Sequence, residues 1–435
     1  MKPVQAMLLI FIVVLSTGCA TPSVALPPVS MPVQPVVAEV PPLVPRLHAW
    51  LVTDPAALVA HVGMDGGALE VITPSAADAV RWSDPISAWL RVGLDLVMLD
   101  QPSPPRVARE LMLLAVGLQD GLLVAETARS QGHTVSEAAL LAMVARGVLL
   151  YTHPIRTQRV EAEATVATWV GGADTVTVAY SRQLGAAVAE SVVAFAHGDG
   201  ADRVVPPSIR APAPGVWQPT PPAEALPLEP GWGEVRPVGI GAAFPLRATP
   251  PPAWDDPTFV ADRDAFRVTQ HQLTDQDRAL AQRWAGLPGT VTPPGQWIEL
   301  GLDYAHRAGF DRQATGAMLA TLAVALHDAM IACWESKFYY MVARPIQWMQ
   351  MSDPAWQPLL TTPPFPSYPS GHATLSGAAS AVVAAYLPGA AVEVGQLAEA
   401  IAWSRVVGGI HWSLDSKAGL RQGAAVGELV VTHVR

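Results

Sequence analysis

The sequence predicts an all-α protein made of two related helical bundles joined by a Pro-rich irregular connection. Long stretches on either side of residues 204–256 are rich in Ala, Leu, Val and Met, and Pro or Gly falls mainly at their ends. These stretches show few of the β-branched alternations that are typical of strands. Segments of the first half also recur in the second half in the same order, which indicates an internal duplication.

Composition limits the class of protein. Apolar residues make up 50% of the 435 residues, charged residues make up 15%, and the net charge is -10. These values exclude a disordered chain and argue against a nucleic-acid partner, which would need a basic surface. The mean hydropathy of +0.28 raises the question of a polytopic membrane protein. Past the N-terminus, however, no uncharged apolar run reaches about 18 residues, so we expect a soluble body.

Residues 1–19 are typical of a lipoprotein signal peptide. Lys2 precedes an apolar stretch from Met7 to Leu15, and Leu15-Ser16-Thr17-Gly18-Cys19 resembles a lipoprotein processing site. The alternatives are a plain cleaved signal or an uncleaved anchor. All three predict export, and lipidation at Cys19 predicts a periplasmic protein anchored to the bacterial outer membrane.

The rest of the chain divides into four parts. Residues 20–46 form a Pro-rich tether with eight prolines, and residues 47–203 form a degenerate N-terminal bundle. Residues 204–256 form a connection in which Trp217, Trp232 and Trp254 favour ordered packing on the surface over a free linker. Residues 257–435 form the C-terminal bundle.

Two pairs of segments carry the duplication. Residues 114–120 resemble residues 322–328, each ending in an Asp, and residues 185–193 resemble residues 423–431. Between these matches, Ser136-Glu137-Ala138 occupies the place of Ser370-Gly371-His372. If the duplication is real, only the C-terminal bundle has kept its chemistry. We expect Asp120 and Asp328 to anchor buried polar contacts.

Three segments of the C-terminal bundle stand out from an uncharged background. Lys337 and Arg344 are two helical turns apart, so both are expected on one helix face, with Pro345 marking the nearby helix end. Ser370 and Gly371 follow a Pro-rich approach and are expected to present a hydroxyl and a free amide at the start of a helix running towards Tyr386.

The third segment runs from Ser404 to Asp415. His411 and Asp415 are four residues apart, so the carboxylate could accept the Nδ1 proton and leave Nε2 as a nucleophile or ligand. With Arg405, the three segments supply three cations, a hydroxyl, a backbone amide and two histidines. This is the composition of a site for a tetrahedral oxyanion.

The pattern resembles the superfamily of vanadium-dependent haloperoxidases and type 2 phosphatidic acid phosphatases, with the chloroperoxidase type as its nearest member. The shared pattern is Lys, six residues, Arg-Pro; then Pro-Ser-Gly-His; then Ser-Arg, five residues, His, three residues, Asp. All three parts are present in order, in residues 337–345, 369–372 and 404–415.

The haloperoxidase resemblance implies vanadate as cofactor, with hydrogen peroxide and halide as substrates. His411 would be the vanadium ligand, and His372 would handle protons. Lys337 would polarise the bound peroxide. The vanadate oxygens would be held by the residues Lys337, Arg344, Ser370, Gly371 and Arg405. Trp334 and Phe365 match positions that border the halide site in chloroperoxidase-type members.

The same residues also fit an exported acid phosphatase without a cofactor. In that alternative His411 would attack a small phosphomonoester and form a phosphohistidine, Asp415 would orient His411, and His372 would protonate the leaving alcohol. A third interpretation, ranked below both, is a non-catalytic lipoprotein that binds anions. The resemblance leaves room for a homodimer.

Overall fold

A computed structural model describes residues 46–63, 69, 71–221 and 224–435. The signal peptide, Cys19 and nearly all of the tether lie outside the described residues, so export and lipidation stay predictions from sequence. Within the described ranges the protein is all-α, as predicted, and the one β-type contact is an isolated bridge between Val216 and Val342.

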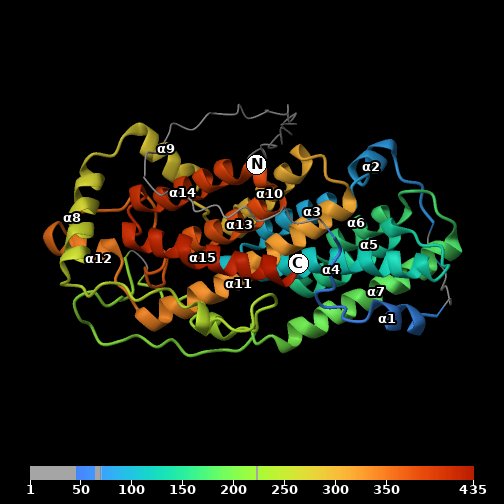
Figure 1. The fold of residues 1–435 in the computed structure, drawn as a ribbon, viewed down its shortest axis with the longest axis horizontal. Helices are drawn as coiled ribbons and strands as arrows, with labels where there is room; N and C mark the ends of the chain where they lie inside the picture. The colour runs from blue at the N-terminus through green and yellow to red at the C-terminus, as the bar shows by residue number, and fades with distance from the viewer. Residues whose placement is uncertain (1–45, 64–68, 70, 222–223) are drawn as a thin grey trace, which may run out of the picture. The chain divides into compact units, whose positions relative to one another are not determined.

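The N-terminal bundle is built around α5, which packs against α4, α6 and α7 (Figure 1). Polar side chains begin several of its helices: Asp84, Ser136 and Asp174 each accept a hydrogen bond from a backbone N–H of the first turn. The bundle comprises α1 (Pro55–His61), α2 (Ala76–Arg81), α3 (Pro85–Asp100), α4 (Pro104–Ser130), α5 (Glu137–Thr152), α6 (Thr157–Trp169) and α7 (Thr175–Gly198).

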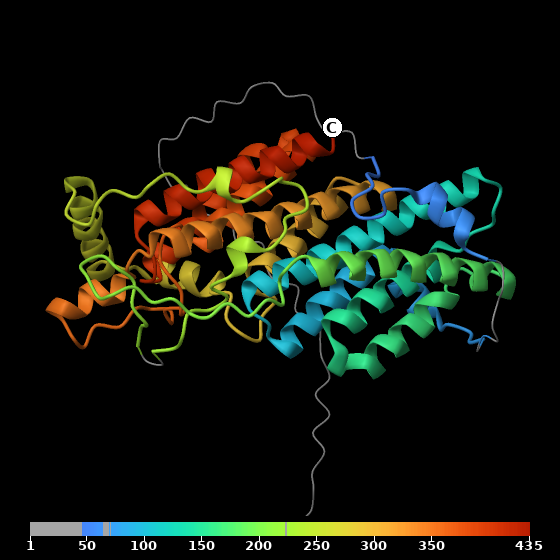
Figure 2. The same cartoon turned by 90° about the horizontal axis from the view of Figure 1, so that it is seen from below.

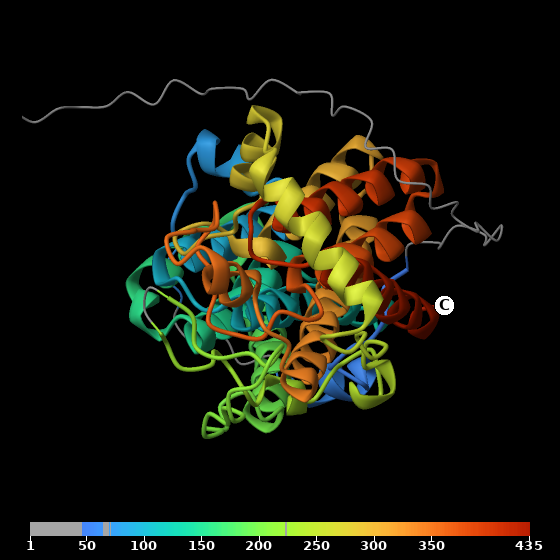
Figure 3. The ribbon, with the colours of Figure 1, turned by 90° about the vertical axis from the view of Figure 1, so that its left-hand side faces the viewer.

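The C-terminal bundle repeats this arrangement around α13, which packs against α11, α14 and α15. Helix α11 also packs along α4 and so joins the two bundles (Figure 2). Helices α8 and α9 lie across one end of this bundle, against α14 and α15 (Figure 3). The bundle comprises α8 (Pro257–His271), α9 (Asp275–Arg283), α10 (Thr292–Arg307), α11 (Arg312–Tyr340), α12 (Pro345–Ser352), α13 (Gly371–Tyr386), α14 (Ala391–Val407) and α15 (Ser413–His433).

Among the described helices, α4 and α11 are long and apolar enough to cross a membrane. In α4, however, 83% of the most apolar window is buried inside the protein, and in α11 all of it is buried. Both are therefore accounted for as core helices, which are expected to be apolar on every side.

The connection over residues 204–256 is ordered and irregular, as its tryptophans predict. Trp217 and Trp232 are fully buried, and the helical elements among the described residues of the segment are two short 3₁₀ turns, Trp232–Glu234 and Phe244–Leu246. It runs along the C-terminal bundle (Figures 1 and 2). The backbone N–H of Trp217 donates to the Met341 carbonyl at 2.7 Å, which fixes the connection to the chain just after α11.

Asp120 and Asp328 occupy equivalent places in the two bundles and make equivalent contacts. Asp120 in α4 accepts hydrogen bonds from three consecutive backbone N–H groups, those of residues 50–52. Asp328 in α11 accepts from those of residues 238–240. Each carboxylate thus anchors the irregular segment that precedes the helices of its own bundle. This supports both the duplication and the anchoring role predicted from the sequence.

Glycines set a close approach between the last and the middle helix of each bundle. A Cβ at Gly185 of α7 would lie 2.2 Å from the Leu140 carbonyl oxygen of α5. A Cβ at Gly423 of α15 would lie 1.9 Å from the Thr374 carbonyl oxygen of α13. Both distances are far inside van der Waals contact, so only glycine permits this spacing.

Replacing Gly423 by Ala should therefore destabilise the protein. The added methyl must push α15 away from α13, at a cost of about 1–3 kcal/mol or more in the free energy of unfolding. Gly395→Ala in α14 is the matched control, because no atom lies within 4 Å of its Cβ position. Thermal and urea unfolding of the two variants check this, and equal stability would contradict the close approach.

Candidate functional site

Lys337 and Arg344 approach the site from different elements, which corrects one prediction. Helix α11 ends at Tyr340, and Met341 adopts a left-handed conformation that closes the helix onto the Lys337 carbonyl. The predicted helix end near Pro345 thus falls at Tyr340, whereas Arg344 is the extended N-cap of a further helix, α12, which Pro345 begins. The shared helix face was therefore wrong, because residues 341–343 pair with the connection instead.

The other motif residues also lie at helix ends. Ser370 is the N-cap of α13 and Gly371 its first residue, as predicted. Arg405 lies in the last turn of α14, and His411 immediately precedes the N-cap of α15. The Ser370 N–H donates to the Asp415 carbonyl oxygen at 3.0 Å, which ties the start of α13 to the start of α15.

The site is buried. The side chains of Lys337, Arg344, Ser370, Arg405 and Asp415 are 0% exposed, and His411 is 2% exposed. Burial of several cations is costly unless each finds polar partners. The chain supplies main-chain carbonyl oxygens for this purpose.

Lys337 is held by three of these carbonyls. Its Nζ donates to the carbonyl oxygens of Pro366 at 3.0 Å and Ser367 at 2.8 Å, and also to that of Pro369. All three belong to the extended arm that leads into α13. The arm therefore both orients the ammonium and places Ser370 at the site.

Arg344 joins the arm to His411. Its Nε donates to the Phe365 carbonyl at 2.9 Å, and its Nη1 donates to the Ile410 carbonyl at 2.6 Å. The same Nη1 lies 3.0 Å from His411 Nε2. Because a guanidinium can only donate, Nε2 accepts in this contact and carries no proton.

Asp415 completes the orientation of His411. Its Oδ2 lies 2.8 Å from His411 Nδ1, the contact that the spacing predicts. Nδ1 therefore carries the proton and donates it to the carboxylate, which leaves the Nε2 lone pair directed at the site. The same Oδ2 accepts a hydrogen bond from the backbone N–H of Trp412 at 3.0 Å.

His372 and Arg405 share a partner that sequence reasoning missed. Arg405 Nη1 donates to the Trp284 carbonyl and lies 3.0 Å from His372 Nε2, which is 3.1 Å from the same carbonyl oxygen. Gly286, with φ +61°, lies beside them, and a Cβ there would be 3.3 Å from His372 Nε2. A main-chain carbonyl leaves no mark in the sequence, and Gly286 is one glycine among 34.

Several buried donors at the site have no protein partner among the described residues. They are Arg344 Nη2, Arg405 Nε and Nη2, and Ser370 Oγ. The N–H of Gly371 adds a fifth donor, because the first residue of a helix has no intrahelical acceptor. Other buried donors, such as Trp284 Nε1, also lack a described partner, but these four side-chain donors belong to three residues of the motifs, and we therefore assign them to an oxyanion. They fit vanadate or phosphate.

The electrostatics agree with this assignment. Burial and then the neighbouring cations, Arg344 first, lower the pKa of His411 well below its usual value. Burial and then Arg405 do the same for the pKa of His372. Burial lowers the pKa of Arg344 and of Arg405 to about 9, so both guanidinium groups stay charged at neutral pH. The site thus combines fixed positive charge with neutral imidazoles.

Trp334 and Phe365, which the resemblance places at a halide pocket, lie together beside Lys337. Their ring centroids are 4.9 Å apart, and the Trp334 Nε1–H donates to the Leu228 carbonyl at 3.2 Å. Lys337 Nζ lies 5.2 Å from the Phe365 centroid. The two rings therefore give Lys337 an apolar, cation-compatible wall.

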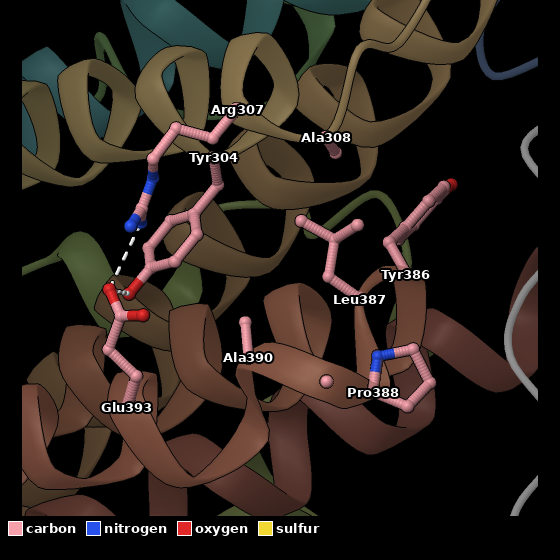
Figure 4. Close-up of a pocket in the computed structure, with 9 residues that line it drawn as sticks. Tyr304, Arg307, Ala308, Tyr386, Leu387, Pro388, Ala390 and Glu393 are labelled. Carbon is pink, nitrogen blue, oxygen red and sulfur yellow. Dashed lines mark hydrogen bonds and ion pairs between the residues drawn. The ribbon is translucent and has the colours of Figure 1, made fainter.

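A separate pocket of about 380 Å³ offers a contrast (Figure 4). Its polar groups satisfy one another: Glu393 accepts from the Tyr304 hydroxyl at 3.1 Å and from Arg307 Nη2 at 3.0 Å. It contains none of the motif residues. Its lining comprises Tyr304, Arg307, Ala308, Tyr386, Leu387, Pro388, Gly389, Ala390 and Glu393.

Comparison with known proteins agrees with the fold and the motifs. Residues 317–395 match the family model described as the VCPO second helical-bundle domain, a range that includes Lys337, Arg344, Ser370 and His372. This segment therefore belongs to that domain family. The sequence matches no curated protein.

Solved structures of vanadium haloperoxidases share the fold. The first bacterial vanadium-dependent iodoperoxidase aligns with a TM-score of 0.72 and 24% identity, over 84% of this chain and 98% of that chain. A holo-type bacterial vanadium-dependent chloroperoxidase aligns with a TM-score of 0.59 and 15% identity, over 78% and 97%. The apo-type chloroperoxidase gives 0.59 and 14%, over 78% and 95%. The protein has the fold of the vanadium haloperoxidases.

Substitution of Arg405 tests the oxyanion site directly. Arg405→Ala removes two buried donors that await an acceptor, so the affinity for inorganic phosphate should fall about 100-fold, the effect of two charge-assisted hydrogen bonds. Calorimetric titration of the full-length protein measures this. Arg307→Ala, in the separate pocket, is the control and should leave the affinity unchanged. An unaltered affinity in Arg405→Ala would refute the assignment.

Protonation of His372 should respond to the anion. In the free protein its lowered pKa keeps the ring neutral at pH 6.5, and a bound anion adds negative charge that raises the pKa. Affinity for phosphate should therefore increase as the pH falls through the raised pKa of the bound form. Nitrogen-15 NMR of labelled histidines, with and without phosphate, measures both effects. A charged His372 at pH 6.5 in the free protein would contradict the expectation.

Proposed function

We propose that this protein is a vanadium-dependent haloperoxidase, which oxidises halide with hydrogen peroxide. The observation that carries the proposal is the set of buried donors without described protein partners on Arg344, Ser370 and Arg405, together with the unprotonated Nε2 of His411, which contacts Arg344. The fold and the domain match support the same family.

Each site residue has a definite part in this proposal. His411 Nε2 would be the ligand of vanadium, because Asp415 fixes the tautomer in which Nε2 carries a lone pair. Arg344 Nη1, which donates to that lone pair in the free protein, would turn to a vanadate oxygen instead. Arg344, Arg405, Ser370 and the Gly371 N–H would hold the vanadate oxygens. Lys337, which the resemblance also implies, gives its three donors to main-chain carbonyls in the free protein and would have to release one of them to reach an oxygen. Vanadate, when bound, supplies the electrophilic centre that activates hydrogen peroxide towards halide.

His372 would supply the proton that the reaction consumes. Hydrogen peroxide, halide and one proton give hypohalous acid and water, so the site needs a group that delivers a proton near the oxyanion. His372 Nε2 accepts from Arg405 Nη1 at 3.0 Å in the free protein, so His372 would first take up a proton when a bound oxyanion raises its pKa and then deliver it. Trp334 and Phe365 would exclude water from the halide.

A phosphatase would use the same atoms, since vanadate mimics the five-coordinate state of phosphoryl transfer. The neutral His411, oriented by Asp415, would also serve as a nucleophile towards a phosphomonoester. The aromatic pair beside Lys337 favours the haloperoxidase, because a small polarisable anion suits an apolar wall better than a hydrated phosphate ester does.

Parallel assays of the full-length protein, prepared without phosphate, separate the two activities. After vanadate loading we expect halogenation of a phenol dye with peroxide and bromide or chloride, and inhibition by added phosphate. The second assay measures hydrolysis of p-nitrophenyl phosphate without vanadate. Hydrolysis that vanadate inhibits, with no halogenation, would establish the phosphatase instead. Binding of vanadate without either activity would indicate an anion-binding protein.

His411→Ala should abolish whichever activity is found, because it removes the ligand or the nucleophile. His372→Ala should reduce kcat more than it weakens vanadate binding, since its part is proton delivery. Turnover and vanadate affinity measured on both variants check this. Undiminished activity in His411→Ala would refute the site.

A further inference from the structure

Ser367 is a buried residue of the site that belongs to none of the three motifs. It lies in the arm before α13 and is 0% exposed. Its N–H donates to the Val342 carbonyl at 2.9 Å, and its carbonyl oxygen accepts from Lys337 Nζ at 2.8 Å. The main chain of Ser367 is therefore fixed independently of its side chain.

The hydroxyl of Ser367 is directed at the carboxylate that orients His411. Ser367 Oγ lies 2.5 Å from Asp415 Oδ2 and 3.4 Å from His411 Nδ1. Nδ1 already carries the proton that it gives to Asp415, so the hydroxyl donates to the carboxylate, over the shorter distance. Oδ2 thus receives three donors, whereas Oδ1 has no partner within the described part of the chain.

These three donors come from two segments. His411 and Trp412 lie just before α15, and Asp415 lies in the first turn of α15, so these three residues would move together. Ser367 alone reaches Oδ2 from the arm. Without its hydroxyl, Asp415 Oδ2 keeps only donors from its own segment, and the arm no longer restrains rotation about the Cβ–Cγ bond.

We propose that Ser367 is a positioning residue: its hydroxyl fixes Asp415 Oδ2 opposite His411 Nδ1, so that His411 Nε2 faces the oxyanion site. The main-chain carbonyl of Ser367 also accepts from Lys337, so Ser367 positions both Lys337 and, through Asp415, His411. The effect on turnover rests on the proposed function, but the effect on the imidazole does not.

The test compares Ser367→Ala and Ser367→Thr with Ser416→Ala in the full-length protein. Ser367→Ala removes the hydroxyl and keeps the main-chain contacts. Ser367→Thr restores a hydroxyl. Ser416→Ala is the matched control, because it removes a buried hydroxyl next to Asp415 that donates to the Ala402 carbonyl at 3.0 Å. Circular dichroism and thermal melting establish that each variant is folded.

The first measurement is the NMR signal of the His411 Nδ1 proton in the protein without vanadate, assigned by its absence in His411→Gln. We expect a slowly exchanging proton in the wild type, in Ser367→Thr and in Ser416→Ala, and a broadened or lost signal in Ser367→Ala. The second measurement is turnover. Ser367→Ala should lose about tenfold in kcat, the effect of one charge-assisted hydrogen bond, with little change in KM.

An unchanged Nδ1 signal in Ser367→Ala would overturn the proposal, as would an equal loss in Ser416→Ala. Failure of a folded Ser367→Thr to restore the signal would also count against it. If the wild type shows no haloperoxidase activity, the proposed function fails while the NMR comparison still decides the role of Ser367.

Discussion

Three basic side chains buried in one site set the main constraint on this structure. Lys337, Arg344 and Arg405 have no exposed surface, and the nearby carboxylate of Asp415 stabilises the charge on Lys337 and on Arg344. Each buried charge costs several kcal/mol unless polar groups replace water. Main-chain carbonyls of the arm and of Trp284 replace part of that water, and the remaining donors need an external oxyanion. The large apolar core, with α4 and α11 at its centre, has to offset the rest.

Helix ends position the residues of the site and make its electrostatic potential positive. Lys337 and Arg405 lie in the last turns of α11 and α14, whereas Ser370 and His411 lie at or just before the starts of α13 and α15. The starts of helices carry partial positive charge and free N–H groups, so they favour an anion. The close contact at Gly423 fixes α15 against α13 and so holds His411 near Ser370.

The sequence could predict the residues of the site better than the segments that carry them. Charged side chains make up only 15% of the sequence, so the fixed spacing of Lys337, Arg344 and His411 can be recognised as a motif. The end of α11 was not predictable from residues 337–345, because contacts with the distant connection decide it. The contacts of the Trp284 carbonyl with His372 and Arg405 could not be predicted, because a main-chain carbonyl does not depend on the residue type. Ser367 lay within the Pro-rich approach, but only the folded arm places its hydroxyl on Asp415.

The predicted duplication places different residues at equivalent helix starts of the two bundles. Ser136 begins α5 as Ser370 begins α13, and Glu137 then stands where the second bundle has Gly371. The Glu137 carboxylate lies at the start of α5 and binds Arg129 at 2.5 Å and also Arg312 of α11. A carboxylate of the chain thus lies at this helix start, between Arg129 of the same bundle and Arg312 of α11. Glycine at position 371 supplies no such anion, so the equivalent place in the second bundle stays open to an oxyanion from solution.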